Sequence, residues 1–502
     1  MIGILVDILA ALWITPFLVG ALGLPQYGTW VIVMSFAGYS AILSLGFNAA
    51  VSREVARTSV STDTAWTNQV VNSTTSLFLV TGAVAFVLLA VCSFFLNAWF
   101  NIPAEFHRAA QIALIVLGLE LGLRLPLSIF PSILSGQQRY VESEAVRIVT
   151  RVVYVAAILL AFRTRSSMVA LSLIVLFTSI LRLGLQWNLV RVATPWLEFG
   201  RRWVSLAVVK KLAGFSLSSF IYLFSQQIMV RANYFVIAVF LTTSDVGAFS
   251  MPSRLVEIML TIAVGITGVM MPVASELEAK GDLERLRSVF FLGTKYVVMV
   301  SVPIMIAFIV LGKSLLVLWI GKEFVGTNLI PIMRLVLVVL TIAVGFQVSQ
   351  TCSFNVLMGM GKHAIFGRIT ILTALFTVVV SVLLIKGFGL GLKGAALANL
   401  ICYAGAYGVI LPVYACRQLR MSFLSYWLGT IGKPLLLGLP IGTATLLMRN
   451  MVEPRSLFLL LIEFAVIFLI YGSSSWFVIL SREERTRLLL VFRPSPSPEI
   501  EQ

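Results

Sequence analysis

Runs of about twenty predominantly apolar residues recur along this chain, and they constrain its fold more than any other feature. Of its 502 residues, 59% are hydrophobic and 12% are charged, whereas soluble domains carry about 25% charged residues. The mean hydropathy is +1.00. Runs of this length cross a bilayer as helices, since barrel strands would be half as long and would alternate. The sequence therefore predicts an all-α integral membrane protein.

Fourteen such runs can be placed along the chain. They cover residues 2–22, 28–50, 72–96, 110–133, 147–163, 167–187, 213–240, 255–275, 292–318, 328–358, 369–386, 393–416, 432–448 and 456–480. The opening stretch has no basic leader before its apolar residues, which favours a retained first span over a cleaved signal peptide. We expect about 14 transmembrane helices.

Basic residues indicate the orientation of these helices. The formal net charge is +16, with 37 Lys and Arg. Twenty-three of these lie in one set of loops and the C-terminal tail, and ten lie in the alternate set. Lys and Arg concentrate in cytoplasmic loops, so both termini are expected in the cytoplasm. No basic stripe is interleaved with aromatic residues, and we expect no nucleic-acid partner.

The chain also repeats itself. "LPQYGTW" (24–30) corresponds to "TSDVGAF" (243–249), and "ILSGQQRY" (133–140) corresponds to "VLMGMGKH" (356–363). Gly28 and Gly247 are 219 residues apart, and Gly136 and Gly359 are 223 apart. Six helices thus occur twice, in the arrangement of secondary transporters. The expected divisions are 1–187 (helices 1–6), a basic cytoplasmic linker over 188–212, 213–416 (helices 7–12), two extra helices over 417–480, and a cytoplasmic tail over 481–502.

Two segments carry a resemblance to a known family. Residues 22–57, "LGLPQYGTWVIVMSFAGYSAILSLGFNAAVSREVAR", and residues 387–401, "GFGLGLKGAALANLI", resemble the bacterial polysaccharide and O-antigen flippases. These are lipid-linked oligosaccharide flippases of the multidrug/oligosaccharidyl-lipid/polysaccharide exporter superfamily. The resemblance implies two six-helix lobes, related by a pseudo-twofold repeat, around a central cavity that opens alternately to either side.

The resemblance also implies a function and a location. The implied substrate is a polyprenyl-pyrophosphate-linked oligosaccharide, flipped across the bacterial inner membrane for O-antigen or exopolysaccharide synthesis. Membrane lipids and the polysaccharide polymerase or ligase machinery would be its partners. The resemblance implies an ion or substrate gradient, not ATP, as the energy source, and no cofactor is expected. In agreement, "GKS" (312–314) lacks the glycine that a phosphate-binding loop has five residues before Gly312, where Ala307 stands.

Polar residues within or at the ends of the spans are the candidates for substrate binding. Ionisable residues are costly in lipid and face a bundle interior or an aqueous cavity. Arginine suits pyrophosphate because its fork binds phosphate oxygens bidentately. The substrate-binding candidates are Arg53, Arg124, Arg231, Arg254, Arg334, Asn48 and Gln227. Arg53 lies at the expected inner mouth of the second helix, where it would either set topology and relieve the helix dipole or capture an anionic headgroup. Asn48 would bind either sugar hydroxyls or the backbone of a neighbour.

Three acids are candidates for ion coupling. They are Asp7 in the first helix, Glu120 four residues before Arg124, and Glu257 three residues after Arg254. The last two spacings also predict ion pairs within a helix. Arg147 and Arg151 are expected to be positive-inside anchors at the inner mouth of the fifth helix.

Other functions stay open at this point. A multidrug or cation antiporter of the same fold would need acidic side chains facing the cavity, and the excess of arginine within the spans argues against it. A lipid II flippase is a further transport alternative. A membrane glycosyltransferase, polymerase or ligase would need a large catalytic loop, and the longest loop, 188–212, holds a single acid. Four cysteines without a CxxC pair and two distant histidines indicate neither a disulfide nor a metal site.

Overall fold

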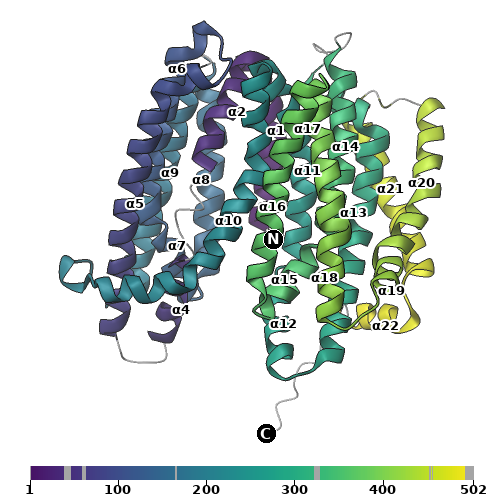
Figure 1. Cartoon of the computed structure of the whole chain (residues 1–502). Coiled ribbons are helices and arrows are strands. Elements are labelled where there is room, and N and C mark those ends of the chain that lie inside the picture. Colours follow the sequence, from purple (N-terminus) through teal and green to yellow (C-terminus); the bar gives the residue numbers. More distant parts are fainter. Residues whose placement is uncertain are drawn as a thin grey trace. The chain divides into compact units, whose positions relative to one another are not determined.

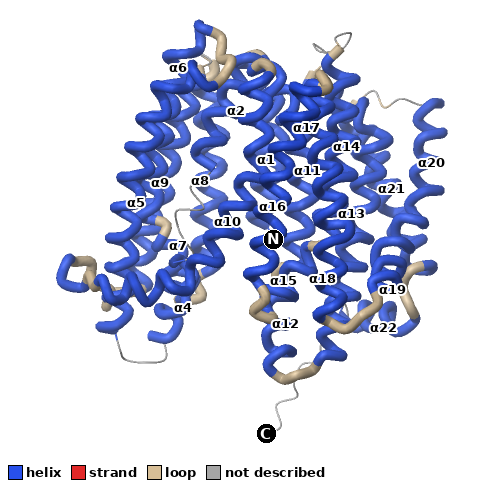
Figure 2. The backbone as a smooth tube through the Cα atoms, in the orientation of Figure 1, coloured by secondary structure: helices blue, strands red, loops and turns tan. Residues whose placement is uncertain are grey.

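A computed structural model describes residues 2–38, 47–58, 64–163, 167–321, 328–451, 454 and 456–491. Among these residues the secondary structure is helical, with no strand (Figure 2). The all-α expectation is thereby confirmed. The helices of the first half are α1 (Ile2–Leu22), α2 (Leu24–Gly38), α4 (Phe47–Thr58), α5 (Thr64–Trp99), η1 (Ala104–Phe106), α6 (His107–Leu127), α7 (Ile129–Gly136), α8 (Tyr140–Ala161), α9 (Met168–Ala193) and η2 (Arg201–Trp203).

The second half continues with long helices, several of them interrupted by a π-helical turn. They are α10 (Leu206–Phe240), α11 (Thr243–Thr267), α12 (Met270–Ala279), α13 (Leu283–Ile320), α14 (Leu329–Ser349), α15 (Thr351–Gly359), α16 (His363–Val382), η4 (Leu383–Gly387), α17 (Gly391–Gly405), η5 (Ala406–Ile410), α18 (Leu411–Gln418), α19 (Phe423–Trp427), η6 (Leu428–Gly432), α20 (Lys433–Met451), α21 (Leu457–Val478) and α22 (Arg482–Val491).

Eleven helical segments within the described residues are long and apolar enough to cross a membrane. Each overlaps one of the expected spans. The other three expected spans coincide with α2 and α4, with α8, and with α10. Residues 39–46, between α2 and α4, lie outside the described residues. The chain is a multi-pass membrane protein, and the number fourteen stays a prediction.

The described structure separates into two compact units. The first comprises Met1–Ile258, Trp319–Ala343 and Gly361–Ala406, and the second comprises Met259–Leu318, Val344–Met360 and Tyr407–Gln502. In the first unit α5 packs on α6, α6 on α9, α9 on α8, and α10 on α16 (Figure 1). Its buried core at one end joins α4, α5, α7 and α9 through residues that include Val55, Val71 and Ile133. The core of the second unit joins α13 to α21 through Val302, Leu311 and Tyr471.

The repeated glycines lie at helix crossings. A Cβ on Gly28 of α2 would lie 1.7 Å from the carbonyl oxygen of Thr243, and one on Gly247 of α11 would lie 3.0 Å from that of Leu24. The two equivalent helices therefore cross at backbone distance, which only a residue without a side chain permits.

The second pair of repeated glycines packs in matching ways within each unit. Gly136 of α7 lies against the backbone of Ser52 in α4, and Gly359 of α15 lies against that of Met271 in α12. Two residues after each glycine the backbone turns left-handed, with φ of 57° at Gln138 and 70° at Gly361. The repeat seen in the sequence is thus a repeat of local structure.

Candidate functional site

An acid in α1 and two arginines in α8 form the first part of the candidate site. Asp7 accepts hydrogen bonds from Arg147 Nη1 at 2.9 Å and from Arg151 Nε at 2.7 Å. Arg147 also donates to Glu144 at 2.5 Å. Arg147 and Arg151 are one helical turn apart, so both reach the same acid on the neighbouring helix. The pairs are partly buried, with 26%, 39% and 30% of the Arg147, Arg151 and Asp7 side chains exposed.

The first turn of α8 carries further charge outside the expected span. Glu142 accepts from Arg139 at 2.9 Å. A hydrogen bond to its own backbone N–H, together with Arg139, holds the pKa of the Glu142 carboxyl below its usual range. This carboxylate stays ionised near neutral pH and favours the N-terminus of the helix, where the backbone N–H groups are positive.

A pocket opens beside the Asp7 cluster. Its volume is about 450 Å³, and its lining comes from α1, α2, α8 and α9. Three arginines line it, Arg147, Arg151 and Arg182, against one acid, Asp7. The pocket lining therefore carries two positive charges in excess. We call this the arginine pocket.

Arg182 differs from the other two arginines of the pocket. It makes no ion pair or hydrogen bond with any residue in the described part of the chain, although its side chain is only partly exposed. The charges of Arg147, Arg124 and Asp7 all act on it. An uncompensated cation within a helix bundle is costly unless an anion or water reaches it.

The ion pair predicted in α6 lies at the edge of the same pocket. Arg124 Nε is 2.8 Å from Glu120 Oε1, and Glu120 is 4% exposed. Ser179, which lines the arginine pocket, donates to Glu120 at 2.6 Å. The i, i+4 pair is confirmed, and it lies against α9.

A second polar cluster lies between α2, α10 and α11. Arg254 Nη1 donates to Glu257 at 3.0 Å, as their spacing predicts. The charges of Glu257, Arg254 and Arg231 act on Tyr234 of α10. Tyr154, in the lining of the arginine pocket, interacts electrostatically with both Arg151 and Arg254. The two clusters therefore belong to one electrostatic neighbourhood within the first unit.

Three candidates from the second half lie outside the lining of the arginine pocket. Arg231 packs beside Gly38, where a Cβ would lie 2.9 Å from its Nε, and this Nε has no hydrogen-bond partner among the described residues. Gln227 lies one turn earlier in α10 and is partly exposed. Arg334, in α14, is also partly exposed and lines none of the pockets described here.

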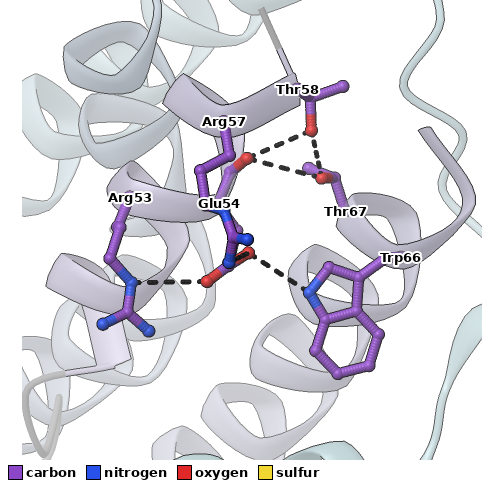
Figure 3. A network of polar contacts seen from close by, with 6 residues as sticks. All are labelled: Arg53, Glu54, Arg57, Thr58, Trp66 and Thr67. Carbon is purple, nitrogen blue, oxygen red and sulfur yellow. Dashed lines mark hydrogen bonds and ion pairs between the residues drawn. The ribbon is translucent and has the colours of Figure 1, made fainter. Parts of the chain in front are cut away.

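The candidates at the end of α4 have structural partners. Glu54, 6% exposed, accepts from Arg53 at 3.3 Å, from Arg57 at 3.5 Å and from Trp66 Nε1 at 3.2 Å (Figure 3). The hydroxyls of Thr58 and Thr67 donate to the Glu54 carbonyl. Glu54 thus ties α4 to α5. Arg53 and Arg57 keep most of their side chains exposed, at 63% and 73%.

Asn48 contacts a neighbouring helix end. Its Nδ2 lies 3.4 Å from Ser128 Oγ, and Ser128 donates to the carbonyl of Leu125 at 2.7 Å. The partner of Asn48 is thus a side-chain hydroxyl rather than the neighbouring backbone that the sequence analysis names, and its role in binding sugar stays a prediction.

Sequence reasoning missed the arginine pocket. It treats Arg147 and Arg151 as topology anchors and gives Arg182 no role. The available signal was the position of Arg182 within an apolar run, the same signal that singles out Arg124 and Arg231. The partnership of Arg147 with Asp7 spans 140 residues and has no sequence signature.

The described residues contain no cluster of three or more metal-ligating side chains. The four cysteines are free.

Comparison with known proteins identifies one relative along nearly the whole chain and another along part of it. It is 18% identical over 493 residues to the uncharacterized membrane protein EpsK of Bacillus subtilis, covering 97% of this chain and 96% of the relative. It is 22% identical over 326 residues to the probable low-salt glycan biosynthesis flippase Agl15 of Haloferax volcanii, covering 64% of this chain and 65% of that one.

Solved structures show the same fold. An inward-facing multidrug resistance MATE family transporter of the MOP superfamily superposes with a TM-score of 0.69 at 14% identity, covering 83% of this chain and 94% of that one. The lipid II flippase MurJ, in an inward closed conformation, gives a TM-score of 0.64 at 15% identity, covering 93% and 98%. Over residues 22–329 the chain matches the family described as "Polysaccharide biosynthesis protein". The chain belongs to this family of polysaccharide biosynthesis proteins, as its first hairpin predicts.

Proposed function

We propose that this protein flips polyprenyl-pyrophosphate-linked oligosaccharide units across a membrane, and that the arginine pocket holds the pyrophosphate. The observation that carries the proposal is Arg182, a partly buried cation that lines a pocket with Arg147 and Arg151 and has no ion-pair partner among the described residues. Charge-assisted hydrogen bonds from guanidinium to phosphate oxygens are short, strong and bidentate. The family and the glycan flippase Agl15 support this direction.

Binding in this pocket implies an exchange of partners. Asp7 occupies Arg147 and Arg151 in the structure. An incoming pyrophosphate competes with Asp7 for these two arginines, while Arg182 is available from the start. Release then restores the pairs with Asp7. Transport by alternating access and its location in the bacterial inner membrane, with both termini cytoplasmic, remain part of the proposal.

Coupling to an ion gradient is a separate step. All three acids predicted for it accept a hydrogen bond or ion pair from arginine: Asp7, Glu120 and Glu257. Asp7 is the one that lines the pocket. The fold does not decide between substrates, because MATE multidrug transporters and MurJ share it. The multidrug or cation antiporter and the lipid II flippase are therefore outcomes of the test.

The test is chemical. The gene is deleted in its host, and lipid-linked intermediates of the inner leaflet are profiled after rescue with wild type, Arg182→Ala, Arg182→Lys and the exposed Arg108→Ala. Wild type and Arg108→Ala should clear complete oligosaccharide units. Arg182→Ala should leave these units on the inner leaflet. Losing a charged hydrogen bond to phosphate costs about 1.5–3 kcal/mol, which weakens the affinity for the substrate roughly 10–100-fold. Absence of lipid-linked sugar together with increased sensitivity to cationic dyes would overturn the proposal in favour of drug export.

A further inference from the structure

The basic linker between α9 and α10 is fixed to the body of the first unit. Asn68 Oδ1 accepts from the Glu198 N–H at 2.9 Å, and Asn72 Nδ2 donates to the Glu198 carbonyl at 2.7 Å. Asn72 Oδ1 accepts from Gly200 N–H at 2.9 Å. Both asparagines are buried in α5, at 3% and 5% exposure. Residues 194–205, which we call the linker, therefore hold a defined conformation at the end of α9 (Figure 1).

A pocket lies between this linker and α9. It measures about 450 Å³, and its lining includes Trp187, Val190, Arg191, Leu197 and Phe199. The rings of Trp187 and Phe199 are 5.0 Å apart, and the Arg191 guanidinium lies 4.5 Å above the Trp187 ring. We call this the linker pocket. It shares no lining residue with the arginine pocket.

The surroundings of the linker pocket combine exposed apolar and basic side chains. Val192 is 73% exposed and Leu206 is 70% exposed. Arg191, Arg201 and Lys210 are exposed as well. Exposed apolar side chains beside basic ones are typical of a surface that lies at the membrane interface, where aromatic rings and arginines meet lipid headgroups.

Arg202 provides an internal contrast. It pairs with Glu198 and stacks on the ring of Trp203 at 5.3 Å. The hydrogen bonds from Arg202 and Trp203 lower the pKa of the Glu198 carboxyl, so this partner stays charged near neutral pH. Arg202 is thus locally neutralised, whereas Arg191 forms no ion pair with a carboxylate among the residues that the structure describes.

We propose that the linker pocket binds an anionic phospholipid. The phosphate lies beside Arg191, and the glycerol and first methylenes of an acyl chain lie along Trp187, Leu197 and Phe199. Charge selects the headgroup, because the pocket offers an arginine and no acid in its lining. The predicted cytoplasmic position of the linker places it at the leaflet that carries anionic lipid. This inference is independent of the transported substrate.

The first experiment measures lipid binding by native mass spectrometry. The full chain in detergent is titrated with phosphatidylglycerol or phosphatidylcholine, using wild type, Arg191→Ala and Arg202→Ala. We expect wild type to retain phosphatidylglycerol in preference to phosphatidylcholine, and Arg191→Ala to bind phosphatidylglycerol about tenfold more weakly. Arg202→Ala, which removes the same charge from the adjoining linker, should bind like wild type. Rising salt should weaken wild-type binding.

Two outcomes would overturn the proposal. Equal binding of both lipids would mean that the pocket has no headgroup selectivity. Equal losses in Arg191→Ala and Arg202→Ala would mean that net basic charge alone attracts the lipid. A second measurement does not depend on the Arg191 variants: brominated phosphatidylglycerol should quench wild-type tryptophan fluorescence more than that of Trp187→Phe. If the two quench equally, the lipid does not lie against Trp187.

Discussion

At the scale of single residues, the backbone contact between α2 and α11 makes the sharpest prediction. Gly28→Ala should strongly destabilise the protein, by about 3 kcal/mol or more, because a Cβ there would meet the Thr243 carbonyl oxygen at 1.7 Å. Gly20→Ala in α1 is the control, since nothing lies within 4 Å of its Cβ position. This change should be neutral or stabilising by up to about 1 kcal/mol. Thermal unfolding in detergent measures both; similar midpoints would contradict the close crossing.

The same scale shows what could be inferred from the sequence about the site. The pairs Glu120–Arg124 and Arg254–Glu257 were predictable, because helical periodicity places such neighbours on one face. The partners of Asp7 were not, since they depend on how α1 packs against α8. Local spacing fixes contacts within a helix, whereas contacts between helices need the fold.

At the scale of elements, the end of α10 is closed by a residue from the connection between α5 and α6. Asn101 Nδ2 donates to the carbonyls of Val239 at 3.0 Å and Leu241 at 2.9 Å, and its N–H donates to Ala238 at 3.1 Å. Asn101→Ala should therefore lower the free energy of unfolding by about 1–2 kcal/mol, since carbonyls at a helix end lose donors.

A matched asparagine serves as the control for this prediction. Within the described part of the chain, Asn188 donates only to the carbonyl one turn earlier in its own helix, at 3.1 Å and on an exposed surface. Asn188→Ala should leave the unfolding midpoint nearly unchanged in the same thermal assay. A loss for Asn188→Ala as large as that for Asn101→Ala would show that the bonds to α10 carry no special weight.

The attachment of α22 to α13 in the second unit predicts a pH dependence. Lys295 Nζ lies 2.8 Å from Glu484, with 8% and 12% of these side chains exposed. Burial acts to raise the pKa of the Glu484 carboxyl, but the hydrogen bonds from Lys295 and Ser481 outweigh it, and the pKa falls below its usual value. A lowered pKa stabilises the fold above the unfolded value of about 4.3, and this contribution is lost as the pH falls through the folded value.

Glu484→Gln tests this pH dependence. At pH 7 the variant should be less stable than wild type by about 3 kcal/mol, because Lys295 is left without its charge partner. The difference should shrink as the pH falls below the unfolded value of about 4.3 and through the lower folded pKa of Glu484, because wild type then loses the carboxylate as well. Glu483→Gln, at the neighbouring position, is the control. Thermal unfolding at neutral and at acidic pH measures the stability of each variant. If the difference between wild type and Glu484→Gln does not change with pH, the ion pair is not its cause.

At the scale of the whole molecule, the fold was largely predictable and the charge distribution was not. Apolar runs of helical length determine the class, and the pairs Gly28/Gly247 and Gly136/Gly359 reveal the repeat, because tight crossings demand glycine at equivalent places. The charges of the arginine pocket do not follow that repeat. The residue 219 positions after Asp7 is Gln226, an uncharged side chain, so the acid that pairs with two arginines has no acidic equivalent at that place. The internal repeat thus predicts how the helices pack, but it does not predict where the charges of the arginine pocket lie.

This asymmetry leads to a prediction about ligand binding by the intact protein. A ligand that binds only the folded state stabilises it by about 2.7 kcal/mol at one hundred times its dissociation constant. Farnesyl pyrophosphate should therefore raise the unfolding midpoint, whereas farnesol, which lacks only the pyrophosphate, should not. Arg182→Ala should weaken the shift more than Arg334→Ala, since Arg182 lines the arginine pocket. If a cationic dye shifts the midpoint and farnesyl pyrophosphate does not, the pocket selects cations, and Asp7 rather than its arginines determines which ligand binds.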